Sequence, residues 1–117
     1  MPEAFTGTRE RPDDRREKGP LFAFPQQAIY AVGVAGVALG IARAMLEAFG
    51  DLAREKTPRG MSKLSENGGV RSGFAKGEAR IAAARAYLVQ VLDEITVRAP
   101  TEKAIDVTDR AHVRLAS

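Results

Sequence analysis

The chain has 117 residues, 44% of them hydrophobic and 28% charged, which suits one folded domain or part of one and excludes a disordered protein. Its net charge is only +3, and basic and acidic residues alternate along it, which excludes the single basic face that binds nucleic acid. The lack of cysteine excludes disulfides, thiolate metal sites and cysteine nucleophiles, and it fits a reducing compartment, so we expect a cytoplasmic protein.

Residues 1–19 predict a disordered leader, because they carry five basic and five acidic residues, two prolines and no apolar period. Gly19-Pro20 then begins the folded part, so we expect a domain over residues 20–117. The short apolar segment LFAF, residues 21–24, precedes Pro25. Because a proline disfavours helical backbone in the residue before it, we expect this segment to be extended.

A long first helix is expected from about residue 25 to about residue 56, with Pro25 in the first turn, where its missing N–H costs nothing. Residues 28–42 (AIYAVGVAGVALGIA) carry no charge on any face. From residue 43 onwards the helix is amphipathic, and Arg43 and Glu47 are spaced for an ion pair across one turn.

Residues 57–69 hold a proline and several glycines between polar residues, which predicts a loop. A second helix should follow, because apolar residues then recur in alternating steps of four and three over seven turns. This seam of a left-handed bundle comprises Val70, Phe74, Gly77, Ile81, Ala84, Leu88, Val91 and Ile95.

Pro100 should stop the second helix, and Asp106 or Thr108 can cap a third one. The expected fold is therefore all-α: a partial up-and-down bundle of two long antiparallel helices and the start of a third. Since the third helix has barely begun at Ser117, we expect the chain to be incomplete.

The uncharged residues 28–42 raise the question of what surrounds them. At 1.5 Å per residue they span roughly 22 Å, short of the ~30 Å hydrocarbon core of a bilayer, and Ala, Gly and Val insert weakly. Acidic residues in the leader are unlike the basic start of a signal peptide. A membrane anchor or export signal is thus the less favoured alternative. A helix that is apolar on every face needs protein on every face, so we expect partners.

Four segments stand in order along the chain: ALGIARA, LAREKTPRG, EARIAAARAYL and DRAHVRLA. In these, residues 18–117 resemble the C-terminal helical domain of the acyl-CoA dehydrogenase superfamily, closest to the branch that includes flavin-dependent monooxygenases. The resemblance implies that residues 20–117 form an incomplete C-terminal four-helix-bundle domain. It also implies contact with the remaining domains of the enzyme or with further copies in a homo-oligomer, and a parent enzyme that exchanges a hydride with flavin (FAD or FMN).

The resemblance further points to a cation after the first bundle helix, where many family members use an arginine to contact the flavin pyrophosphate of a neighbouring subunit. Lys56 and Arg59 are the candidates, and a cation suits a phosphate chemically. Two basic residues at the C-terminal end of a helix can equally do no more than favour its dipole. His112 matches no family base and is expected at the surface, and we predict no catalytic residue and no metal site.

The expected function is therefore that of a partial acyl-CoA dehydrogenase-like flavoprotein, whose bundle supports oligomerisation and flavin binding in an oxidoreductase that oxidises an acyl-CoA or oxygenates a substrate. By itself the chain should be inactive and bind no flavin, because the catalytic parts of the family lie elsewhere. The alternative is a stand-alone helical protein-interaction module, and a small membrane-anchored protein comes after it.

Overall fold

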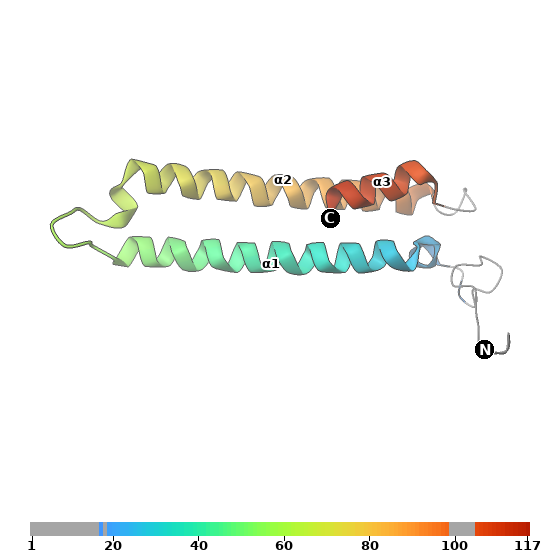
Figure 1. Cartoon of the computed structure of the whole chain (residues 1–117), viewed down its shortest axis with the longest axis horizontal. Coiled ribbons are helices and arrows are strands. Elements are labelled where there is room, and N and C mark those ends of the chain that lie inside the picture. Colours follow the sequence, from blue (N-terminus) through green and yellow to red (C-terminus); the bar gives the residue numbers. More distant parts are fainter. Residues whose placement is uncertain (1–16, 18, 99–104) are drawn as a thin grey trace, which may run out of the picture. The chain divides into compact units, whose positions relative to one another are not determined.

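The computed structural model describes residues 17, 19–98 and 105–117 (Figure 1). Its elements are helical, and no strand occurs in the described part of the chain, which confirms the all-α prediction. In chain order they are the 3₁₀ helix η3 (Pro20–Ala23), α1 (Gln26–Glu55), the 3₁₀ helix η4 (Leu64–Glu66), α2 (Gly68–Arg98) and α3 (Val107–Ala116). The predicted leader lies almost wholly outside the described residues, as does Pro100.

The chain divides into two compact units. The terminal unit combines residues 1–33 with residues 88–117, and the hairpin unit comprises residues 34–87. Both α1 and α2 contribute to each unit, so each unit is described by itself.

The first helix begins and ends within one residue of its predicted limits. The carbonyl of Pro25 accepts hydrogen bonds from the N–H groups of Ala28 (2.9 Å) and Ile29 (3.2 Å), so the proline opens the first turn without losing a bond of its own. At the other end the N–H of Lys56 still bonds to the carbonyl of Leu52 at 2.9 Å.

The prediction that residues 21–24 are extended is wrong, since most of this segment belongs to η3. Pro20 stands at the start of that helix, where its fixed φ suits a tight turn, and the N–H of Phe22 bonds to the carbonyl of Gly19 at 3.0 Å. Only Phe24, directly before Pro25, is extended (φ −71°, ψ 133°). The restriction that a proline imposes therefore reaches one residue back and no further.

The predicted loop is two residues shorter than expected, because Gly68 and Gly69 already belong to α2. The Oδ1 atom of Asn67 accepts from the N–H groups of Gly69 (2.9 Å) and Val70 (3.2 Å), as the residue before a helix does when it caps the first turn. Asp106, rather than Thr108, caps α3, in a reciprocal capping box with Asp109.

In the terminal unit a small core joins the ends of α1 and α2 to α3. It consists of Phe24, Ala28, Val91, Ile95, Ile105 and Val113. Val91 and Ile95 come from the seam predicted on the second helix, which confirms that part of the pattern.

In the hairpin unit the two helix segments lie antiparallel. A Cβ atom added to Gly77 would lie 3.1 Å from Cδ1 of Leu46, and one added to Gly50 would lie 3.0 Å from the ring of Phe74. Position numbers therefore fall on α2 as they rise on α1, and glycine gives the two backbones room to approach. The seam residues here are half-buried except Ala84, which is exposed.

Candidate functional site

Lys56 and Arg59 lie on the connection that follows α1. Both side chains are exposed, and neither makes an ion pair or side-chain hydrogen bond with another described residue. The carbonyl of Lys56 accepts from the N–H of Leu64 at 3.0 Å, which closes the connection into a loop directly after the helix. The structure thus places both candidates in one loop, but their side chains do not contact a common residue.

Arg59 occupies the tip of a tight turn. The N–H of Met61 bonds to the carbonyl of Pro58 at 3.0 Å, and Gly60 has a φ of +74° at the third position of the turn. That φ is the one a type II turn requires there, and only glycine adopts it without steric cost. The turn therefore places Arg59, whose side chain is exposed, at its second position.

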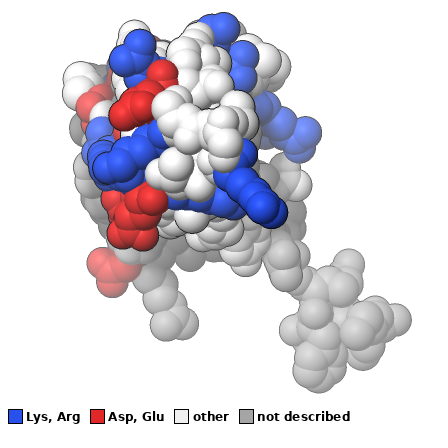
Figure 2. Space-filling model, turned by 90° about the vertical axis from the view of Figure 1, so that its left-hand side faces the viewer, with Lys and Arg blue, Asp and Glu red and all other residues white. Residues whose placement is uncertain are grey.

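This end of the hairpin unit is more basic than acidic. Residues 51–71 contain five lysines and arginines against three acidic residues, a local net charge of +2. In Figure 2, which views the molecule from the end with the 56–67 loop, basic side chains spread over the face while acidic ones gather toward one side. A local excess of positive charge favours an anion over a cation at this end of the unit.

By residue type, Lys56 and Arg59 could hold a phosphate group such as that of a flavin. A guanidinium can donate two parallel hydrogen bonds to phosphate oxygens, and an ammonium acts as a point charge that donates up to three. Neither group would need to break an existing ion pair in order to bind. The part played by Lys56 and Arg59 would be binding and orientation.

Deeper in the hairpin unit Arg43 joins two carboxylates. Its Nε donates to Oε1 of Glu47 at 2.8 Å, as predicted from the spacing, and its Nη1 donates to Oε2 of Glu78 at 2.6 Å. The hydrogen bond with Glu47, aided by the one with Glu78, raises the pKa of Arg43 above its ordinary value. Through this ion pair Glu78 links α2 to α1.

The face of α1 that points away from α2 is apolar and exposed. We call it the α1 outer stripe; within the hairpin unit it comprises Val34, Val37, Ile41, Met45 and Leu52. Val34 is 70% exposed and Met45 is 68% exposed. Steps of three, four and seven residues align these side chains along one side of the helix. By length and composition α1 is also a candidate to cross a membrane, a test that core helices of soluble proteins pass as well.

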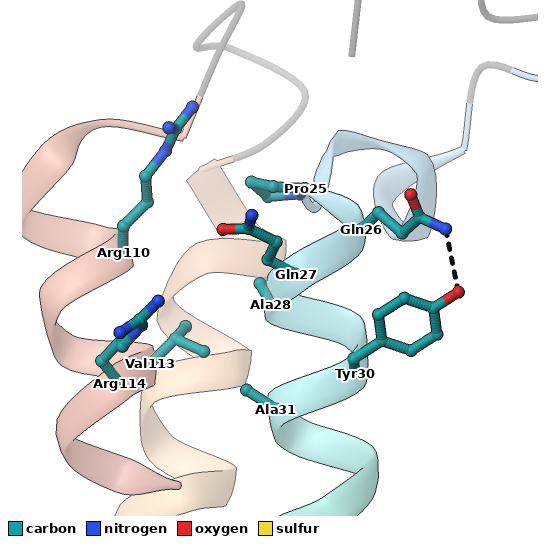
Figure 3. Close-up of a pocket in the computed structure, with 9 residues that line it drawn as sticks. All are labelled: Pro25, Gln26, Gln27, Ala28, Tyr30, Ala31, Arg110, Val113 and Arg114. Atoms are coloured by element: carbon teal, nitrogen blue, oxygen red, sulfur yellow. Dashed lines mark hydrogen bonds between the residues drawn. The ribbon is translucent and has the colours of Figure 1, made fainter. Parts of the chain in front are cut away.

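The terminal unit holds a groove of about 520 Å³ between the beginning of α1 and α3 (Figure 3). Ala28, Ala31 and Val113 form its apolar part, and Arg110 and Arg114 stand on its α3 side. We call it the α1–α3 groove. No sequence pattern indicated this groove, because its residues come from opposite ends of the chain.

An ion pair between α2 and α3, in which the carboxylate is buried, was also missed. Asp109 is 4% exposed, and it accepts a hydrogen bond from Nη2 of Arg98 while its other oxygen faces the N–H of Asp106. From the sequence alone, the spacing of Asp106 and Asp109 indicates only a capping box, and not a partner for Asp109 on another helix. His112 is exposed, as predicted, and the described residues contain no cluster of metal-ligating side chains.

Comparison with known proteins gives one family. The family model described as "Acyl-CoA dehydrogenase, C-terminal domain" matches residues 32–117, which include most of α1, all of α2 and α3, and both Lys56 and Arg59. No curated protein and no solved structure gave a match. Since the matched region covers well over half of the sequence and its helices stand in the expected order, the chain belongs to the acyl-CoA dehydrogenase family through the C-terminal domain of that family.

Proposed function

We propose that the chain serves as a helical-bundle domain in a flavin-dependent oxidoreductase of the acyl-CoA dehydrogenase type. That enzyme would either oxidise an acyl-CoA or, as an oxygenating relative, transfer oxygen to a substrate. The observation that carries this proposal is the family match over residues 32–117. The domain would contribute a surface for association and a contact to flavin, and it would act in the cytoplasm.

Association is supported by the α1 outer stripe. Monomeric soluble proteins rarely expose large contiguous apolar patches, and burying apolar surface yields roughly 25 cal/mol per Å². The stripe carries no charged side chain from Val34 to Leu52 on its own line along the helix. A second copy of the chain, or another domain of the enzyme, would cover it.

Flavin contact is supported by the unpaired cations of the 56–60 loop. A bound flavin would supply the hydride acceptor. Lys56 and Arg59 would hold the diphosphate of FAD, or the single phosphate of FMN, and so fix the cofactor against the end of α1. Neither residue would take part in the redox step itself.

The flavin contact is tested in the complex that the chain forms in its source cells. A tagged chain is purified with its bound proteins, which are identified by mass spectrometry, and flavin is measured by its visible absorbance. The double variant Lys56→Ala, Arg59→Ala should lower flavin content while the same proteins co-purify. Lys63→Ala, a change to another exposed cation of the same connection, should not. A complex without flavin would refute the proposal.

Association through the stripe is tested with Met45→Asp. A carboxylate at this exposed position costs a single chain little, but in an apolar interface it would be buried without a partner, at several kcal/mol. Sedimentation should show a smaller assembly with unchanged helicity. Ser72→Asp, at an exposed site on α2, is the control. An assembly of unchanged mass for Met45→Asp would show that the stripe is not the interface.

The stand-alone interaction module remains the second candidate, because the α1 outer stripe alone would serve it equally well. The same purification separates the two. A stable complex that contains neither flavin nor a protein with the remaining enzyme domains, but that depends on Met45, would favour the interaction module.

A further inference from the structure

The methionines of the hairpin unit stand in two different settings. Met45 lies in the middle of the α1 outer stripe, between Ile41 and Leu52, and is 68% exposed. Met61 is 64% exposed as well, but it lies in the loop that follows α1, outside that stripe. A third methionine, Met1, lies outside the described residues. The unit therefore offers two thioethers of nearly equal exposure, and one of them lies in the surface proposed for association.

A thioether is the group in this chain that a two-electron oxidant attacks most easily. The chain has no cysteine and no tryptophan, so its only sulfur atoms are those of methionine. Hydrogen peroxide transfers one oxygen atom to such a sulfur: a lone pair of the sulfur forms the S–O bond, the O–O bond breaks, and the second oxygen leaves as water with both protons. The sulfur loses two electrons and the peroxide gains them. The product, methionine sulfoxide, is polar, and methionine sulfoxide reductases restore the thioether.

The position of the sulfur decides what this oxidation changes. A sulfoxide at Met61 stays in water, where its oxygen accepts hydrogen bonds from the solvent. A sulfoxide at Met45 would be buried by any partner that covers the stripe, among apolar side chains such as Val37 and Ile41 that hold no donor. A polar oxygen buried without a hydrogen bond opposes association. The same cover takes Met45 out of solvent, so peroxide reaches it in the free chain.

We propose that Met45 is an oxidation site that controls association. Hydrogen peroxide converts it to the sulfoxide in the free chain, the sulfoxide prevents a partner from covering the α1 outer stripe, and reduction restores association. Assembled chains are protected, because their thioether is covered. This inference rests on the association proposed above and does not depend on flavin.

The test compares the complex that the chain forms in its source cells with the purified full chain at a dilution where sedimentation shows it free. Both are treated with hydrogen peroxide, and the sulfoxide at each methionine is followed by mass spectrometry of proteolytic peptides. Met45 should oxidise at least about fivefold more slowly in the complex, because susceptibility follows exposure, whereas Met61 should oxidise at one rate in both. The oxidised chain should reassemble with a dissociation constant at least about tenfold higher, and a methionine sulfoxide reductase should reverse this loss.

Conservative variants tie the outcome to one sulfur atom. Met45→Leu removes the thioether but keeps the apolar volume, so it should assemble and lose its response to peroxide. Met61→Leu should respond as the parent chain does. Met45→Gln, with an uncharged polar side chain of similar length, should assemble poorly without any peroxide.

The results that would overturn the proposal are distinguishable from one another. A chain that forms no assembly before peroxide is added would refute the association and this proposal with it. An assembly that re-forms unchanged from chains oxidised at Met45 would refute the oxidation site alone. A Met45→Leu chain that loses assembly in peroxide as the parent does would place the sensitive group elsewhere.

Discussion

Ile95→Ala should destabilise the terminal unit by about 2–3 kcal/mol. Ile95 is 2% exposed and belongs to the core with Val91 and Val113. The change removes three carbon atoms from the core, at about 0.8 kcal/mol each, and leaves a cavity that the neighbouring side chains fill only in part. Because alanine has a higher helix propensity than isoleucine, it offsets a few tenths of a kcal/mol of this loss. The loss of core contacts is the larger effect by several fold.

The assay is urea unfolding followed by far-UV circular dichroism, at one protein concentration so that association contributes equally to every variant. Val97→Ala is the matched control: it lies two residues along the same helix and is 78% exposed. Its free energy of unfolding should stay within about 0.5 kcal/mol of the parent chain. If the two variants lose the same stability, the core of the terminal unit is not where the structure places it.

Two further predictions concern stability. Gly36→Ala should raise the free energy of unfolding by about 0.5–1 kcal/mol, because the added Cβ would meet nothing within 4 Å. Gly50→Ala should show no such gain, because its Cβ would lie 3.0 Å from the ring of Phe74. Equal gains for the two variants in urea unfolding would contradict this packing. Asp109→Asn should cost about 1–2 kcal/mol, because it removes the anionic partner of Arg98 from a buried site; an unchanged melting temperature would show that the pair contributes nothing.

Helix positions were predictable because local signals agreed with one another. Pro25 marks the start of α1, and the uncharged run that follows contains no residue that stops a helix, so the limits came out within one residue. On α2 the steps of four and three found Leu88, Val91 and Ile95, which are all buried. These features depend on neighbours within about two turns, which a sequence shows directly.

What could not be predicted depends on contacts between separate helices. The ion pair of Arg98 with Asp109, the link from Arg43 to Glu78 and the α1–α3 groove each join separate helices. The error at residues 21–24 has a different origin. It extended the effect of Pro25 over a whole segment and overlooked that Pro20 itself favours a helical turn.

Lys56 and Arg59 stand between these cases. Their place after α1 followed from the resemblance, and the structure adds the turn at Gly60 and shows no ion pair of either side chain with a described residue. Which anion they meet depends on a molecule outside the chain. Their role in flavin contact is therefore tested in the assembled complex rather than read from the fold of this chain.

The surroundings of α1 can be argued one step further. Ala35, Gly50 and Ala53 are buried, so part of the circumference of α1 is covered within the chain, while the outer stripe is not. The covering helix, α2, carries Lys76, Arg80 and Arg85 beside the hairpin segment of α1, and Glu78 is tied to Arg43. If this segment of α1 lay in a bilayer, those charges on α2 would enter hydrocarbon with it, at about 2.5–3.5 kcal/mol for each lysine or arginine even on insertion scales. On this argument we expect protein rather than lipid to cover the outer stripe, as the proposed association requires.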